Sequence, residues 1–232
     1  MKFLVLQHIN IEHPGIFLKF MKEDKVQIDT VELDENEKIP QLNKYDAMIV
    51  MGGPMDTWQE ETYPWLKPEK EVIHKFVTIQ KKPFLGLCLG AQLLGEAVGG
   101  KVRKMKTPEI GVLGVSLINN KSLFKGLNKD LKVLQWHSYE VHDLPSSTNL
   151  LATSPQSKIQ AFSSGNAFGL QFHVEQTSET VPQWACVPEY KSALEKTLGS
   201  NALAKFEKDV QENLNLFNNS ARTIYDNFKK II

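Results

Sequence analysis

The feature that most restricts the fold of this chain is a cysteine set between two glycines. Residues 86–90 read Gly-Leu-Cys-Leu-Gly, directly after the apolar run 84–87 and before the helix-compatible run 91–94. Glycines here permit a sharp strand-to-helix turn, because they remove side-chain contacts with neighbouring backbone. The positive end of the following helix favours a thiolate on Cys88. We therefore predict a nucleophile elbow with Cys88 at its tip, the alternative being a small buried cysteine.

Strand-like and helix-like segments alternate through the first hundred residues. Predicted strands lie at 2–6, 26–31, 47–51 and 84–87, and predicted helices at 16–22 and about 65–80. This alternation is typical of a parallel sheet with helices on both faces, and such sheets bind ligands beyond the carboxyl ends of their strands. We expect a three-layer α/β fold with a largely parallel open sheet. The loops after Val50, Leu87 and Phe172 should then carry the site.

The second half of the chain has a different pattern. Strand-like pieces separated by Asn, Pro, Ser and Gly lie at 112–118, 133–136, 150–152, 159–162 and 167–172, which indicates a β-rich half. Residues 189–232 become helical, with apolar side chains three or four positions apart on one face, namely Leu203, Phe206, Val210, Leu214 and Phe217. No Gly-, Ser- or Pro-rich linker divides the chain. We expect one domain over residues 1–232, with a motif-bearing part of about 1–185 and a C-terminal helical extension of about 189–232.

Charge and composition disfavour several classes of function. Lys plus Arg and Asp plus Glu number 27 each, so no net field attracts nucleic acid or an anionic membrane surface. No apolar run reaches the length of a spanning helix, and the N-terminal run turns polar too early for a secretory signal. Cys88 and Cys186 are the two cysteines, which suits a reducing compartment. We expect a cytoplasmic protein in which Cys186, having no elbow around it, is structural.

A histidine and a glutamate follow the last predicted strand. In 169–175, Leu170, Phe172 and Val174 alternate with Gln171, His173 and Glu175, so His173 and Glu175 share a face. A carboxylate beside an imidazole fixes its tautomer and leaves the other nitrogen to act on a nucleophile. A solvated pair at a strand edge and a metal site are the alternatives. We expect no metal ion, because no third ligand lies nearby and a thiol–imidazole pair needs none.

Three motifs together resemble the class I glutamine amidotransferase family. They are Met51-Gly52-Gly53-Pro54, the run 86–92 around Cys88, and the run 171–175 with its His and Glu. The resemblance covers about residues 1–185 and is strongest to stand-alone members similar to the amidotransferase half of GMP synthase. It implies a Cys88 nucleophile, a His173 acid–base and an orienting Glu175. The family usually has Pro between the last two, whereas this chain has Val174, a departure that bears on their orientation.

The resemblance also implies further site residues. The backbone N–H groups of Gly53 and Leu89 would form the oxyanion hole, since glycines after a buried strand let N–H groups point into a cleft. The residues implied to bind substrate are Gly52, Gln92, His137, Ser138 and Tyr139.

The implied reaction is hydrolysis of the glutamine side-chain amide through a γ-glutamyl thioester, releasing glutamate and ammonia. No cofactor is implied. Because the chain has no phosphate-binding loop and no room for a synthetase, we expect any ammonia-accepting synthetase to be a separate chain. Without a fused domain the cleft above Cys88 would also admit a larger leaving group. The alternative is therefore a γ-glutamyl peptide hydrolase with the same triad, and a second is a non-catalytic interaction protein on this fold.

Two other features have bland explanations. His8 and His13 flank Asn10 after the first strand, either as a metal pair or as polar loop residues beside the cleft. The basic run 101–106 is expected to be a solvated surface. A chaperone- or glyoxalase-like protein also exposes an elbow cysteine, but a Phe-His-x-Glu segment such as 172–175 is foreign to that family.

Overall fold

The computed structural model describes residues 1–118 and 121–232. Within them, nine strands form one sheet in the order β2-β1-β3-β4-β9-β8-β7-β5-β6. The strands are β1 (Lys2–Gln7), β2 (Gln27–Glu32), β3 (Ala47–Val50), β4 (Phe84–Leu87), β5 (Lys101–Leu117), β6 (Asp130–His142), β7 (Asn149–Thr153), β8 (Ala161–Ser164) and β9 (Ala167–Leu170). The helices are α1 (Ile16–Glu23), α2 (Leu66–His74), α3 (Leu89–Ala97), α4 (Thr180–Trp184), α5 (Pro188–Leu198) and α6 (Ala202–Lys229), with short turns η1 (Leu42–Lys44), η2 (Lys75–Ile79) and η3 (Ser122–Phe124).

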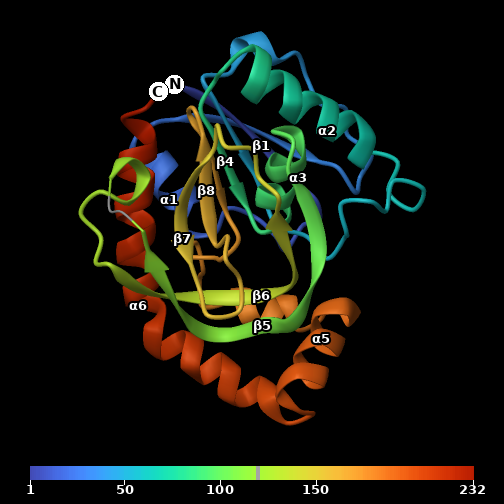
Figure 1. Cartoon of the computed structure of the whole chain (residues 1–232), viewed down its shortest axis with the longest axis vertical. Coiled ribbons are helices and arrows are strands. Elements are labelled where there is room, and N and C mark those ends of the chain that lie inside the picture. The colour runs from blue at the N-terminus through green and yellow to red at the C-terminus, as the bar shows by residue number, and fades with distance from the viewer. Residues whose placement is uncertain (119–120) are drawn as a thin grey trace.

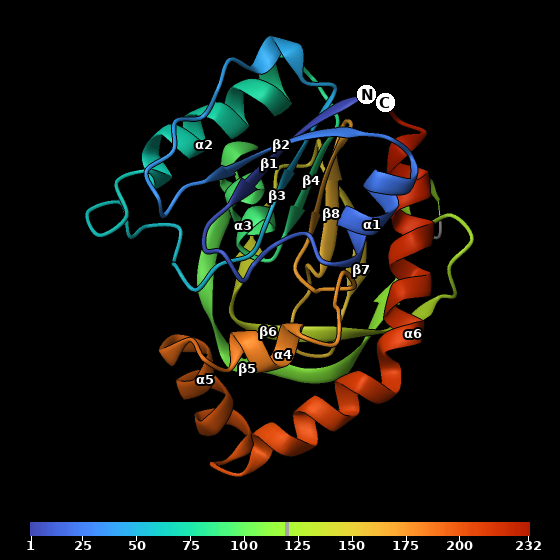
Figure 2. The ribbon, with the colours of Figure 1, turned by 180° about the vertical axis from the view of Figure 1, so that it is seen from behind.

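One half of the sheet is parallel and the other antiparallel. β1 pairs in parallel with β2 and β3, β3 with β4, and β4 with β9. From β9 through β8, β7 and β5 to β6 the neighbours are antiparallel. Helices α2 and α3 cover one face and α1 and α6 the other (Figures 1 and 2). The predicted three-layer α/β fold is confirmed, and its antiparallel half corresponds to the β-rich second part of the sequence.

Hydrophobic layers lie on both faces of the sheet. Phe17, Ile224 and Phe228 belong to the layer under α1 and α6, and Ile73 and Leu93 to the layer under α2 and α3. Alternate residues of β1 enter different layers. This explains why β1 is apolar throughout, since a parallel strand that is covered on both faces has no polar side.

The carboxyl ends of the parallel strands meet at one edge of the sheet. The register aligns Leu6 of β1 with Val50 of β3, and Leu87 of β4 with Leu170 of β9. The chain leaving these strands therefore emerges in one place, where sheets of this kind bind ligands. The last of these loops begins after Leu170 rather than after Phe172. The loop after β1, which the sequence did not single out, joins the other three.

The antiparallel arm is longer than predicted. β5 and β6 pair over most of their length, with an irregularity between Lys104 and Glu109. The predicted pieces 112–118 and 133–136 are only the apolar centres of these strands. The basic run 101–106 forms the start of β5, and its lysines are exposed. Charged ends hide such a strand from a search for apolar runs, because cross-strand hydrogen bonds need no apolar side chain.

The C-terminal helices pack on this arm. A third apolar cluster joins Ile110 of β5 and Trp136 of β6 to Trp184, Tyr190 and Phe206 from α4, α5 and α6. The rest of α6 returns along the face that it shares with α1 (Figure 2). Among the described helices, none is both long and apolar enough to cross a membrane.

Candidate active site

Cys88 occupies a sharp turn between β4 and α3. Its φ of 50° is in a region that side chains rarely adopt, and it is the residue that precedes the first turn of α3. A Cβ on Gly86 would lie 2.4 Å from the Gly90 carbonyl oxygen, and a Cβ on Gly90 would lie 2.2 Å from the Val50 oxygen. Both flanking glycines are therefore required by close backbone packing. The predicted elbow conformation is present.

Backbone hydrogen bonds hold the elbow in this conformation. The Cys88 N–H donates to the Leu170 carbonyl of β9 at 2.8 Å, and its own carbonyl accepts from Ala91 and Gln92. A strained φ of this kind costs about 1–3 kcal/mol and persists only where surrounding contacts enforce it. The thiol is 7% exposed and faces a cavity. In contrast, Cys186 is exposed, and its thiol contacts the Pro182 carbonyl at 3.4 Å.

His173 and Glu175 are paired beneath Cys88. Their ring Nδ1 and carboxylate Oε1 are 2.6 Å apart, and both side chains are buried. His173 lies beyond the end of β9, where its backbone exchanges two hydrogen bonds with Leu134 of β6. Phe172 and Val174 point into the core on the other side. The predicted alternation therefore continues past the strand, although the predicted strand itself stops earlier.

The residue between the pair has a specific contact. The Val174 backbone N–H donates to Glu175 Oε2 at 2.9 Å, so both carboxylate oxygens are engaged. A proline at position 174 could not make this bond, because it has no N–H. The departure from the usual family pattern thus adds a hydrogen bond that orients Glu175.

The surroundings of His173 favour its charged form. Burial opposes a charge on the ring, but the charge of Glu175 and hydrogen bonds with Cys88 and Glu175 outweigh it and raise the pKa of His173 well above its ordinary value. Trp184 packs its ring edge-on against the imidazole at 4.7 Å between centroids. An imidazolium here would stabilise a thiolate on Cys88.

Two backbone amides border the same space. Gly53 and Leu89 line the cavity with Cys88. Within the described residues neither N–H group has a hydrogen-bond acceptor, whereas the neighbouring Gly90 N–H donates to Met51. A Cβ on Gly53 would lie 3.0 Å from both His8 and Leu89 side-chain carbons. These N–H groups are therefore available to an anion beside the thiol.

The cavity in front of Cys88 measures about 170 Å³. Four of the five residues predicted to bind substrate line it, namely Gln92, His137, Ser138 and Tyr139. Gly52 is absent from the lining; a Cβ on it would lie 2.7 Å from Glu12 Oε2. The remaining wall comes from α5, through Glu189, Tyr190 and Ala193. The expectation of an uncovered cleft is therefore wrong, because the C-terminal extension folds back over the site.

Polar contacts fix the cavity wall. Gln92 Nε2 is 3.2 Å from Gln171 Oε1, and Gln171 Nε2 is 3.6 Å from the Cys88 sulfur. Asp56 also lines the cavity; its burial raises its pKa, while a hydrogen bond from Tyr139 opposes the rise. Gln171 was not among the predicted site residues. Its position two residues before His173, on the same side of an alternating segment, is the signal that could have found it.

A further buried carboxylate lies behind the triad. Burial raises the pKa of Glu12 to about 7, although the charge of His173 and a hydrogen bond from Tyr190 both lower it. Glu175 adds to the rise and His8 opposes it. Glu12 therefore carries a titration near neutral pH into the fold, and Tyr190 connects it to α5.

We expect replacement of Glu12 by glutamine to change how stability depends on pH. A carboxyl with a raised folded-state pKa contributes stability that is present below about pH 4.5 and lost as pH rises through about 7. Glutamine keeps an acceptor for Tyr190 without ionising. The unfolding free energy of E12Q relative to the parent protein should rise by about 3 kcal/mol between pH 4 and pH 8. Urea unfolding at both pH values measures it, and an unchanged difference would refute the titration.

The two N-terminal histidines do not form a metal pair. His8 is buried against Glu69, and His13 accepts a hydrogen bond from the Gly15 N–H. Among the described residues no group of three or more His, Cys, Asp or Glu side chains is arranged to hold a metal ion.

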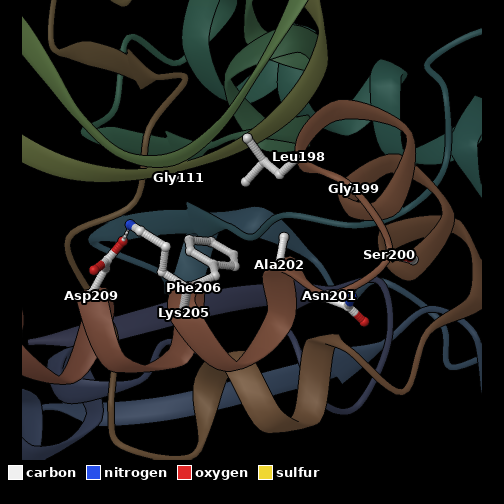
Figure 3. A pocket seen from close by; sticks show the side chains of 9 residues that line it. All are labelled: Gly111, Leu198, Gly199, Ser200, Asn201, Ala202, Lys205, Phe206 and Asp209. Carbon is white, nitrogen blue, oxygen red and sulfur yellow. Dashed lines mark hydrogen bonds and ion pairs between the residues drawn. The ribbon is translucent and has the colours of Figure 1, made fainter.

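A larger cavity, about 570 Å³, lies away from Cys88 (Figure 3). It is bounded by Gly111 of β5 and by the turn between α5 and α6. Its charged side chains, Lys205 and Asp209, pair with each other across one helical turn. Because it holds no nucleophile or base, the smaller cavity is the candidate site.

Comparison with known proteins points the same way. The family model for class I glutamine amidotransferases matches residues 17–183. The chain is 32% identical to the glutamine-hydrolysing subunit of GMP synthase from Saccharolobus solfataricus, over 71% of this chain and 84% of that protein. It is 31% identical to γ-glutamyl peptidase 3 of Arabidopsis thaliana, over 63% and 59%. A glutamine amidotransferase structure from Thermotoga maritima superimposes with a TM-score of 0.89 at 29% identity, covering 98% of this chain and 97% of that one.

Proposed function

This chain belongs to the class I glutamine amidotransferase family, and from that premise we propose that it hydrolyses the side-chain amide of glutamine at Cys88. The observation that carries the proposal is the contact series from Glu175 through His173 to Cys88, at a strained elbow that opens on a cavity. A nucleophile, a base and an orienting carboxylate in that order are what thiol-based acyl transfer requires.

The first half of the reaction forms a thioester. The Cys88 thiolate attacks the amide carbon, and the oxygen becomes an oxyanion facing the N–H groups of Gly53 and Leu89. The His173 imidazolium donates a proton to the amine as the C–N bond breaks, and ammonia leaves. Glu175 holds Nδ1 throughout, so that the other nitrogen faces the sulfur.

The second half consumes water. Neutral His173 takes a proton from a water molecule, whose oxygen attacks the thioester carbon through a second oxyanion. The C–S bond then breaks, glutamate leaves, and Cys88 and His173 return to their starting state. No metal or cofactor is needed for either half.

The charge of the cavity fits the amino-acid end of the substrate. Among its described lining residues, two are carboxylates, Asp56 and Glu189, and none is Lys or Arg. We propose that these carboxylates face the α-ammonium group of glutamine. The polar wall from His137 to Tyr139 and the Gln92 amide would then contact the rest of the backbone end and the side chain.

A γ-glutamyl peptide hydrolase is the second candidate. The likeness to γ-glutamyl peptidase 3 favours it, and the thioester chemistry is the same with an amine in place of ammonia. The wall from α5 opposes it, because Tyr190 and Ala193 occupy the side of the cavity where a larger leaving group would lie.

We further propose that a synthetase on a separate chain receives the ammonia, as the name of the Saccharolobus relative, which is one subunit of a synthase, suggests. A cytoplasmic location is proposed from the two free thiols. The packing of α4, α5 and α6 on β5 and β6 supports the proposal of one domain.

The isolated protein is expected to be a slow glutaminase, because partner binding usually orders such sites further. Purified protein is incubated with glutamine and, separately, with γ-glutamyl dipeptides or glutathione, and glutamate and each leaving group are measured. We expect kcat/KM for glutamine to equal or exceed that for the dipeptides. A dipeptide preference on the order of 100-fold, about 2.7 kcal/mol in transition-state stabilisation, would instead assign the peptidase. No turnover of either class, with cell extract added, would overturn both.

A further inference from the structure

A second buried histidine–glutamate pair lies beneath the glycine loop. His8 follows β1, and its Nδ1 is 2.7 Å from the carbonyl oxygen of Gly52. Its Nε2 is 2.9 Å from Glu69 Oε1 of α2. Both side chains are 0% exposed. The hydrolytic steps above make no use of this pair, and burying it is costly unless it does something for the fold or the site.

The direction of these hydrogen bonds follows from their chemistry. A backbone carbonyl can only accept, so His8 Nδ1 carries a proton and donates it to Gly52. Trp65 stacks on the imidazole at 5.5 Å between centroids and restrains it from one side. The ring is therefore held by Gly52, Glu69 and Trp65 together.

The bond to Gly52 also determines where the next N–H points. The Gly52 C=O and the Gly53 N–H belong to one planar, trans peptide and point in opposite directions. A peptide between two glycines has little steric resistance to rotation, so its orientation needs an external contact. The His8 bond supplies that contact, and the Gly53 N–H, without an acceptor among the described residues, lies at the cavity of Cys88.

We propose that His8 and Glu69 are positioning residues for the oxyanion hole: His8 holds the Gly52 carbonyl so that the Gly53 N–H faces the substrate oxygen, and Glu69 holds His8. The inference rests on the proposed function and deepens it by assigning the support of one oxyanion donor.

The charge of His8 strengthens the effect. Burial opposes protonation, but the charge and hydrogen bond of Glu69, with smaller contributions from the Gly52 carbonyl and Glu12, raise the pKa of His8. A cation on the Gly52 oxygen polarises the peptide and makes the Gly53 N–H a better donor. Loss of one oxyanion donor typically lowers kcat about 10²–10³-fold.

Two matched substitutions separate positioning from general support. The amide nitrogen of asparagine takes about the place of Nδ1, so His8→Asn keeps a donor for Gly52. The longer His8→Gln reaches toward Glu69 instead. Both lose the ring and its stacking on Trp65. We expect H8Q to have a kcat for glutamine about 100-fold below wild type and H8N to lie within about tenfold of wild type, with KM changed less than about threefold in each.

A second readout isolates the oxyanion. Alkylation of Cys88 by iodoacetamide displaces iodide at a saturated carbon and builds no oxyanion. Its rate should therefore stay within about twofold of wild type in both variants. His74→Gln, on an exposed histidine of α2, is the surface control for the same substitution, and thermal unfolding checks that each variant is folded.

Equal kcat values in H8N and H8Q, or alkylation that falls in parallel with kcat, would overturn the proposal. Should the wild-type protein hydrolyse neither glutamine nor γ-glutamyl peptides, the proposed function fails, and crystal structures of the two variants decide the inference separately. The Gly52 carbonyl should then face residue 8 in H8N and turn away in H8Q. The same orientation in both would contradict it.

Discussion

Replacing Cys88 by alanine is expected to lower kcat for glutamine hydrolysis by on the order of 10⁴-fold or more. Removal of the nucleophile leaves only substrate binding and the oxyanion donors, which act on water far less well than on a positioned thiolate. The change removes a small side chain that is already 7% exposed, so the fold should persist. Cys186→Ala is the matched control and should keep kcat within about twofold, because that thiol is exposed and contacts only a backbone carbonyl among the described groups.

The same pair of variants tests covalent labelling. A glutamine-like electrophile, such as a diazo-ketone analogue, should label Cys88 and not Cys186, because only Cys88 has a base beside it. Peptide mapping locates the label. Label found mainly on Cys186, or undiminished in C88A, would refute the nucleophile assignment.

Replacing His173 by alanine is expected to lower kcat about 10³-fold, since the imidazole moves protons in both halves of the reaction. Glu175→Ala should cost at least tenfold less, because the carboxylate orients and stabilises the ring without touching the substrate. Steady-state kinetics of the two variants, with KM and kcat separated, measures the ranking.

His74→Ala is the control for loss of an exposed imidazole and should leave kcat unchanged. Unfolding curves are needed for Glu175→Ala, because its loss leaves the Val174 N–H without its acceptor. Small and equal effects from His173→Ala and Glu175→Ala would mean that this segment does not carry the chemistry.

The residues that sequence could locate are those tied to a local pattern. Gly86, Cys88 and Gly90 lie within five positions, and the backbone spacing that demands the glycines is a property of that turn alone. His173 and Glu175 are two positions apart, so alternation places them on one side even though β9 has already ended. The parallel half of the sheet follows from apolar runs that are buried on both faces.

The residues that sequence could not locate depend on distant segments. Glu12 and Tyr190 are hydrogen-bonded although 178 positions separate them, and Glu69 meets His8 across 61. A glutamate in a polar loop or on a helix is usually exposed, so nothing local marks Glu12 or Glu69 as buried. The wall that α5 adds to the cavity is hidden for the same reason, since its amphipathic sequence does not say which surface it covers.

The most direct measurement is mass spectrometry of the protein quenched in acid during turnover of glutamine, followed by peptide mapping. We predict a γ-glutamyl adduct on the peptide that contains Cys88, labile to hydroxylamine as a thioester is. The adduct should be absent in C88A, and it should be enriched in His173→Ala if thioester hydrolysis slows more than its formation. Steady glutamate release with no adduct on Cys88, or an adduct on Cys186, would contradict the proposed mechanism.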